Sequence, residues 1–221
     1  MTTANATDMV KIYLYSRFER FWHWVQAALI VGLLITGLEV HGTYTLLGFR
    51  SAVSLHNTLG ISWLVLYIFI IFWLATTGEW RQYVPTTRKL IDVIRYYSID
   101  IFRGRPHPVK KRKDAKHNPL QRLTYLGLSA VLLPIQMLTG LIYYLYNDWA
   151  AYGVDGWLDL GTLAVIHMAM AFLILSFLIV HIYMTTTGHT ITSHIAAMFS
   201  GWEEVSRETE IEEWEKAPQR R

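Results

Sequence analysis

The sequence contains no cysteine among its 221 residues. That absence excludes disulfide bonds, iron–sulfur clusters and zinc sites held by thiolates, and the covalent haem attachment of c-type cytochromes. Acidic side chains are scarce inside the long apolar stretches, although the chain has 17 of them. Histidine and methionine, with nine and seven residues, remain as possible ligands for a metal or a haem.

The composition is typical of a helical membrane protein. Hydrophobic residues make up 52% of the chain, and its mean hydropathy is +0.25, which is too apolar for an ordinary soluble domain. Four apolar runs are long enough to cross a bilayer, and they predict helices over about 18–40, 52–77, 119–146 and 157–187. The expected fold class is an all-α membrane protein. It is a four-helix transmembrane up-down bundle within residues 1–200, kinked at Pro134 and followed by an acidic tail at 201–221.

Lysine and arginine are distributed unevenly between the connections. Nineteen of the 20 lie in the N-terminal segment, in the long connection between the second and third helices, and in the tail, whereas only Arg50 lies in the first connection. The positive-inside rule therefore predicts that both termini and the basic loop are cytoplasmic. The basic loop is either a topology signal that contacts anionic membrane lipid, or a docking surface for a soluble partner or for haem propionates. No nucleic-acid partner is expected.

The fourth apolar run carries two histidines with an informative spacing. His167 and His181 bracket thirteen residues that are apolar except for Ser176. On a helix, this separation gives a rise of roughly 21 Å and returns the second side chain to within about 40° of the first. One helix therefore presents two histidines on one side, at two depths of a hydrocarbon layer about 30 Å thick. Because polar side chains in lipid are costly, we expect two stacked ligands for two stacked cofactors.

Two further histidines match these depths. His56 lies near the outer start of the second helix, at the level of His167, and His23 lies near the cytoplasmic start of the first helix, at the level of His181. We predict an outer pair, His56 with His167, and an inner pair, His23 with His181, each joining two helices across the bundle. Such pairs fit bis-histidine haem b, which leaves the iron no open position and so serves electron transfer. Interhelical hydrogen bonding and histidine-lined transport of zinc or copper are the alternatives.

A short internal repeat links the first and third helices. Residues 34–37 read LITG and residues 137–140 read MLTG, and each of these helices is followed by one with a histidine near its outer end. Duplication of a helix pair explains the repeat, and so does chance. Small residues at these points allow a helix or a macrocycle to approach closely.

Several motifs resemble those of one cytochrome family. The segment RFWHW at 20–24, followed by LITG at 34–37, is similar to the opening of prokaryotic di-haem b561-like cytochromes. These include cytochrome b subunits of nickel–iron hydrogenase, the gamma subunit of formate dehydrogenase and thiosulfate reductase relatives. The segment HNTLG at 56–60 resembles their second-helix ligand motif, and the spacing of His167 and His181 matches their last helix. The resemblance covers about residues 17–200. It implies two haem b groups whose axial ligands form the pairs predicted from depth.

The resemblance also implies a quinone site near the cytoplasmic haem. Formate dehydrogenase-like members open their third helix with N-x-x-Q-[KR], and Asn118-Pro-Leu-Gln121-Arg122 is similar. This similarity implies Asn118 and Gln121 as contacts for menaquinone or ubiquinone, although Leu120 replaces a glycine that is frequent in the family. An asparagine before proline is also an ordinary helix N-cap. Arg20 is a candidate for holding a haem propionate, or else a topology signal.

The function implied is that of an integral di-haem cytochrome b subunit in a bacterial inner membrane. It passes electrons between a quinone pool and a partner dehydrogenase, hydrogenase or reductase subunit that carries iron–sulfur or haem centres. One alternative is a stand-alone cytochrome b561 that exchanges electrons between quinone and a small molecule such as superoxide. Another is a haem-free, histidine-lined metal carrier. The long basic loop favours a partner, but the motifs distinguish neither its identity nor the direction of electron flow.

Overall fold

The computed structural model describes residues 9–105, 107–109, 116–188 and 190–206. The chain forms two compact parts. The helical part comprises residues 21–72 and 129–184, and the strand part comprises residues 1–20, 73–128 and 185–221. The long helices contribute residues to both parts.

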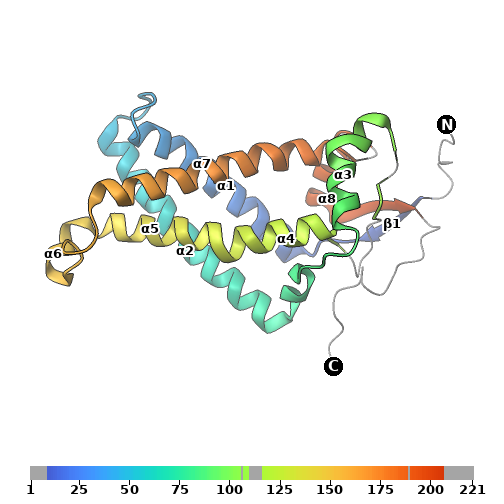
Figure 1. Cartoon of the computed structure of the whole chain (residues 1–221), viewed down its shortest axis with the longest axis horizontal. Coiled ribbons are helices and arrows are strands. Elements are labelled where there is room, and N and C mark those ends of the chain that lie inside the picture. The colour runs from blue at the N-terminus through green and yellow to red at the C-terminus, as the bar shows by residue number, and fades with distance from the viewer. Residues whose placement is uncertain (1–8, 106, 110–115, 189, 207–221) are drawn as a thin grey trace. The chain divides into compact units, whose positions relative to one another are not determined.

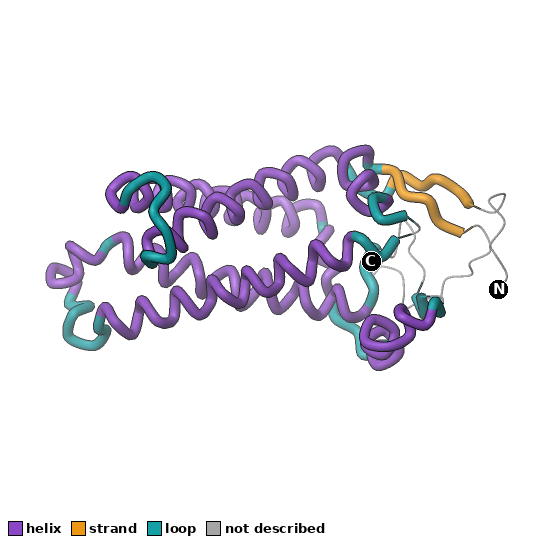
Figure 2. Tube along the Cα trace, turned by 90° about the horizontal axis from the view of Figure 1, so that it is seen from above, coloured by secondary structure: helices purple, strands orange, loops and turns teal. Residues whose placement is uncertain are grey.

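Four helices among the described residues are long and apolar enough to cross a membrane, which confirms the predicted fold class. Within the helical part they run alongside one another, as Figures 1 and 2 show. Their ends lie within three residues of the predicted ones. The four spans are α1 (Arg17–Val40), α2 (Phe49–Thr77), a third span over Pro119–Tyr144, and α7 (Leu160–Thr185).

Capping residues decide where two of these helices begin. Before α1, Ser16 and Glu19 cap each other's backbone. The Ser16 N–H donates to Glu19 Oε2 at 2.7 Å, and the Glu19 N–H donates to Ser16 Oγ at 3.2 Å. Before α7, Asp159 Oδ1 accepts the N–H of Thr162 at 2.9 Å. Because aspartate is a preferred N-cap, α7 begins three residues later than the apolar run alone predicts.

The third span is not a uniform helix. It comprises α4 (Pro119–Gly127), the π-helical turn η5 (Leu128–Leu132) and α5 (Leu133–Tyr144). The wide turn lies directly before Pro134, which has no N–H to donate to the preceding turn. Tyr67 on α2 donates its hydroxyl to the Ser129 carbonyl at 2.6 Å. A side chain from another helix therefore satisfies a carbonyl in the irregular turn.

Glu39 closes the connection between α1 and α2. Its Oε1 accepts the backbone N–H groups of Leu46, Leu47 and Gly48 at 2.7–2.8 Å, and the residue is only 4% exposed. Charge-assisted bonds of this kind fix the loop that leads into α2. The connection between the third span and α7 contains η6 (Tyr146–Asp148) and the short helix α6 (Trp149–Tyr152).

The described residues of the strand part include a two-stranded antiparallel sheet (Figure 2). Strand β1 (Met9–Tyr13) pairs with β2 (Trp202–Ser206), and Tyr13 lies opposite Trp202. Strand β2 lies within the segment that the sequence predicts as an acidic tail. The rest of that tail, residues 207–221, lies outside the described residues.

Gly201 connects α8 (Ser193–Ser200) to β2 with φ +87°. Its carbonyl accepts the N–H groups of Leu14 and Tyr15 at 2.8 and 3.2 Å. A Cβ at this position would lie 2.6 Å from Tyr13 Cε2 and 2.8 Å from the Tyr15 carbonyl oxygen. Both the left-handed backbone and the close approach therefore require glycine.

The long basic loop folds into short helices of the strand part. Asp100 accepts from two arginines, with Arg95 Nε at 3.5 Å and an Arg105 guanidinium nitrogen at 3.3 Å. The lysines and the arginine at 110–113 lie outside the described residues. The elements of the loop are η2 (Glu79–Tyr83), α3 (Leu90–Arg95), the π-helical turn η3 (Tyr96–Asp100) and η4 (Ile101–Arg103).

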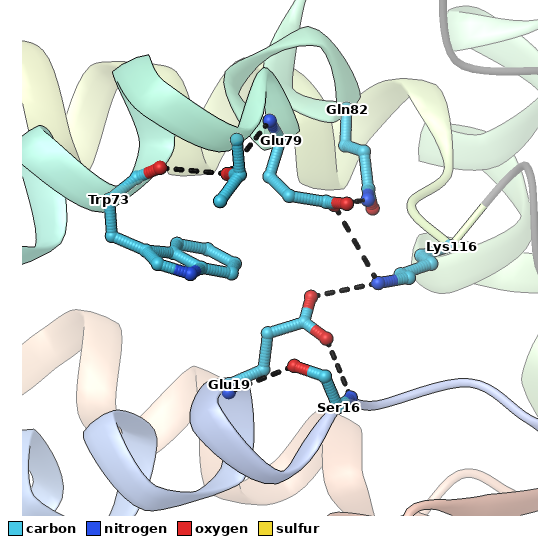
Figure 3. A network of polar contacts seen from close by, with 7 residues as sticks. Ser16, Glu19, Trp73, Glu79, Gln82 and Lys116 are labelled. Carbon is cyan, nitrogen blue, oxygen red and sulfur yellow. Dashed lines mark hydrogen bonds and ion pairs between the residues drawn. The ribbon is translucent and has the colours of Figure 1, made fainter.

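A buried ion pair joins three segments of the strand part (Figure 3). Lys116 Nζ lies 2.8 Å from Glu19 Oε1 and 3.8 Å from Glu79 Oε2. The Lys116 and Glu19 side chains are 9% and 11% exposed. Gln82 donates its amide to Glu79. The lysine before α4 therefore bridges the first turn of α1 and the start of η2.

Candidate cofactor site

The structure brings the four histidines of the sequence prediction together as two pairs within the helical part. The ring centroids of His56 and His167 are 6.3 Å apart, with ring planes at 78°. Those of His23 and His181 are 6.2 Å apart, with ring planes at 49°. Two metal–imidazole bonds of about 2 Å, plus roughly 1 Å from each bonded nitrogen to its ring centre, span about 6 Å. Both pairs therefore have the ring separation that fits two axial ligands on one haem iron.

The LITG and MLTG segments hold the histidines of the outer pair. Thr36 Oγ1 lies 2.9 Å from His56 Nδ1, and Thr139 Oγ1 lies 3.0 Å from His167 Nδ1. Both threonines are buried. With Nδ1 engaged in this way, Nε2 is the nitrogen of each ring that could bind a ligand in the space between the helices.

The glycine after each threonine makes room for the imidazole. A Cβ at Gly37 would lie 3.1 Å from His56 Cε1, and a Cβ at Gly140 would lie 3.1 Å from His167 Cε1. These are close contacts, so a side chain at either position has to displace the ring. The paired motifs thus combine one hydroxyl contact with one steric requirement.

We expect Gly140→Val to weaken cofactor binding at the outer pair while leaving the inner pair intact. The added methyl groups push the His167 ring from its place, and the haem-to-protein ratio of purified protein measures the loss. Gly127→Val on α4 is the matched control, because a Cβ there meets nothing within 4 Å. Equal haem loss in both variants would mean that a valine in the helix, rather than the imidazole contact, is responsible.

A pocket lies between the outer histidines, with an empty volume of about 520 Å³ including the part open to the outside. Its lining is mostly apolar and includes His56, His167, Gly60, Gly140 and Trp63. Apolar walls with a few convergent polar groups are usual for a cofactor site.

The Gln136 side chain also reaches into this pocket. Its amide nitrogen lies 3.1 Å from His167 Nε2. Its buried Oε1 has no hydrogen-bond partner among the described residues. The amide therefore has to turn aside before His167 Nε2 can bind a metal, and its hydrogen bond to that nitrogen is then lost.

The inner pair has different surroundings. His23 contacts the Trp24 ring edge-on at a centroid distance of 5.2 Å, and His181 stacks on Phe177 at 5.6 Å and 19°. Within the described part of the chain, the buried His23 Nδ1 has no hydrogen-bond partner. Aromatic packing positions the inner rings, whereas hydroxyl groups position the outer ones.

Asn118 and Gln121, the candidates for quinone contact, cap the start of α4. Asn118 Oδ1 accepts the Gln121 N–H at 2.9 Å, and Gln121 Oε1 accepts the Asn118 N–H at 3.0 Å. Asn118 Nδ2 also donates to the Tyr97 hydroxyl at 3.3 Å. Burial raises the pKa of Tyr97 to about 12, with a smaller contribution from neighbouring Tyr96. The local reason for Asn118 is therefore the capping box, and its amide adds a contact to a tyrosine that stays neutral.

Arg20, the candidate for holding a propionate, contacts other elements of the strand part. Its guanidinium donates to the Phe199 carbonyl at the end of α8 and lies 3.5 Å from the Tyr13 hydroxyl. Among the described residues, no group of three or more His, Asp or Glu side chains could hold a metal ion. For the metal-carrier alternative, the histidine pairs of the described residues offer two ligands each, whereas zinc sites in proteins usually have three or four.

Sequence reasoning did not assign roles to Thr36, Thr139 and Gln136. The repeated [LM]-[IL]-T-G pattern was the available signal for the two threonines, but spacing alone could not show that each faces a histidine on the next helix. No comparable signal marks Gln136, because a lone glutamine in an apolar run is compatible with many interhelical contacts.

Comparisons with known proteins place the chain in a family. The family model described as prokaryotic cytochrome b561 matches residues 14–201. The chain is 34% identical to the cytochrome YdhU of Escherichia coli over 209 residues, covering 90% of this chain and 77% of that protein. It is 25% identical to a B-type cytochrome subunit of Ni/Fe-hydrogenase from Rhodobacter capsulatus over 217 residues, covering 86% and 80%.

Proposed function

Since the chain belongs to the prokaryotic cytochrome b561 family, we propose that it is a di-haem subunit that passes electrons between a membrane quinone and a partner oxidoreductase. The family and the four spanning helices make the protein a multi-pass membrane b-type cytochrome that acts in electron transfer. The proposal adds two haem groups, a quinone substrate and a partner. It also adds an inner-membrane location with both termini in the cytoplasm, which rests on the distribution of Lys and Arg.

The observation that carries the proposal is the two histidine pairs with ring separations of 6.3 and 6.2 Å. His56 and His167 would hold one haem, and His23 and His181 the other. Haem bound between two histidines supplies a one-electron carrier with no open position on its iron. The chain's own residues set the two depths through the fourteen-residue spacing on α7 and exclude water with apolar walls.

The partner part of the proposal is supported by a relative and by charge. The Rhodobacter relative is named as a B-type cytochrome subunit of a Ni/Fe-hydrogenase, and this likeness supports a partner subunit for the present chain. The basic loop of this chain carries most of its lysines and arginines, and such a surface suits an acidic partner or anionic lipid. A dehydrogenase, hydrogenase or reductase subunit with iron–sulfur or haem centres is the class of partner that could exchange electrons with the haem.

The proposal is tested by adding a menaquinol or ubiquinol analogue to the purified, oxidised protein and following the haem absorbance. We expect the quinol to reduce the haem at a rate that depends on quinol concentration. Protein purified without haem, or haem that quinol does not reduce and quinone does not oxidise, would overturn the proposal.

Asn118→Ser separates a quinone contact from helix capping. Serine caps a helix about as well as asparagine does, so we expect the melting temperature to stay near the wild-type value. Loss of the amide removes one hydrogen bond to the quinone, which corresponds to about a tenfold slower reduction by quinol. Asn118→Ala, which loses both functions, provides the comparison. An unchanged rate in the serine variant would leave Asn118 with the capping role alone.

A further inference from the structure

Two separate helix pairs in the helical part use the same contact. On α1, Thr36 contacts His56 of α2 at 2.9 Å. On α5, Thr139 contacts His167 of α7 at 3.0 Å. A glycine follows each threonine, and in both cases a Cβ added to that glycine would lie 3.1 Å from the imidazole Cε1. Agreement in both contacts, on helices far apart in the sequence, indicates one arrangement used twice.

The threonine hydroxyl groups act as acceptors toward the histidines. Thr36 Oγ1 already donates to the Gly32 carbonyl at 2.8 Å, and Thr139 Oγ1 donates to the Ile135 carbonyl at 2.8 Å. A hydroxyl has one proton to donate, so its lone pairs face the imidazole. The proton of each contact therefore belongs to histidine Nδ1, and Nε2 carries the free lone pair.

Gln136 supports the same tautomer from the other side of the ring. Its amide nitrogen lies 3.1 Å from His167 Nε2, and an amide NH₂ group can only donate. His167 Nε2 is then an acceptor without a proton of its own. Two contacts on opposite nitrogens of one ring thus agree on a histidine prepared to bind a metal through Nε2.

We propose that Thr36 and Thr139 are positioning residues that fix the outer histidines as Nδ1-protonated ligands and hold the reduction potential of the outer haem below that of the inner one. This inference rests on the proposed haem binding at the two pairs. A hydrogen bond donated from Nδ1–H makes Nε2 a stronger donor to the metal and favours the oxidised iron. The inner pair lacks this support at His23 Nδ1, which has no partner among the described residues.

A more reducing outer haem would make transfer of an electron from the outer to the inner site energetically downhill. The net direction between the partner oxidoreductase and the quinone is set by the potentials of those two redox couples.

The test is a redox titration of haem absorbance in purified Thr36→Val and Thr139→Val proteins. Valine keeps the shape of threonine and removes the hydroxyl. We expect each substitution to shift the reduction equilibrium of the outer haem about tenfold toward the reduced state, which is an upward shift of about 59 mV for one electron. The inner haem keeps its potential. The outer wave is identified as the one lost in His167→Ala.

Thr36→Ser and Thr139→Ser restore the hydroxyl and should return the outer wave to near its wild-type position. Thr58→Val is the matched control, because Thr58 on α2 donates to the Ser54 carbonyl at 2.9 Å in the same way. It is an exposed residue and neither histidine contact involves its hydroxyl. The electron paramagnetic resonance signal of the oxidised outer haem provides a second measurement, because it depends on the orientation of the two imidazole planes.

The outcomes separate this inference from the proposed function. A wild-type protein without two redox waves contradicts the di-haem proposal itself. Two waves that stay in place in both valine variants overturn only the role of the threonines. A shift in Thr58→Val as large as that in Thr36→Val also overturns it, since loss of any hydroxyl in the helical part would then have the same effect.

Discussion

Replacing His167 with alanine is expected to reduce the haem content from two groups per chain to one. His167 provides one of the two imidazoles of the outer pair, and its partner His56 alone offers a single axial ligand. The inner pair consists of His23 and His181, which the substitution does not change, so it keeps both of its imidazoles. Pyridine haemochrome analysis, expressed as haem per chain, measures the change.

His181→Ala is the reciprocal variant and is expected to lose the inner haem and keep the outer one. His41→Ala is the control. His41 is exposed beyond the end of α1 and contacts the Thr43 hydroxyl at 3.3 Å, so both haems should remain. If folded His167→Ala protein retained two haems, the assignment of the outer pair as ligands would be wrong. If the wild-type protein bound no haem, the paired histidines would instead be interpreted as interhelical hydrogen-bonding residues.

Lys116→Met is expected to cause the largest loss of stability among single substitutions in the strand part. Removing the lysine leaves the buried Glu19 carboxylate without its countercharge. Glu79 also loses its longer ion pair with Lys116, at 3.8 Å. Breaking a buried pair in this way costs about 3–5 kcal/mol, which lowers the melting temperature by on the order of 10 °C for a chain of this size. Thermal unfolding followed by circular dichroism in detergent provides the measurement.

Two further variants identify the cause of that loss. Glu19→Gln combined with Lys116→Met removes both charges and should recover much of the stability, because no buried charge remains uncompensated. Lys11→Met breaks an ion pair with Glu204 whose side chains are 70% and 52% exposed, and it should have no measurable effect. A Lys116→Met protein as stable as the Lys11→Met protein would show that the buried pair contributes little.

The spanning helices could be predicted from sequence because the signal is local. A run of about 20 apolar residues crosses a bilayer whatever surrounds it, and the four runs correspond to the four helices within three residues at each end. The ends themselves depend on caps. Asp159 moves the start of α7, an effect that the apolar pattern does not contain.

The grouping of histidines could also be predicted, because helix geometry is regular. Residues 167 and 181 share a face of α7 through the 3.6-residue period, and the topology assigns His23 and His56 to matching depths. In the structure the same two pairs face each other, with ring centroids 6.2–6.3 Å apart. Depth and helix face together were sufficient, because each pair joins only two helices. The outer pair lies on α2 and α7, which run parallel in an up-down bundle, and the inner pair lies on α1 and α7, which run antiparallel.

The strand part shows where prediction from sequence ended. Residues 9–13 and 202–206 pair as strands although they lie far apart in the chain, and the all-α fold class expected from the sequence contains no strand. Sheet pairing depends on a partner strand, so a single five-residue strand carries little information on its own. Lys116 likewise looked like one charge among many in a basic loop, until Glu19 and Glu79 were placed beside it.

The sequence by itself determined the membrane character, the four spans, the grouping of four histidines into two pairs, and the family. These properties follow from hydrophobicity, helical period and short motifs, all of which are local. Only the tertiary structure decided that Thr36 and Thr139 contact the outer histidines, that Gln136 reaches His167 Nε2, and that Lys116 is buried against Glu19. Each of these contacts joins residues that are at least 20 positions apart in the chain. Such contacts depend on how the helices pack, and that packing is set by the whole chain rather than by any segment of it.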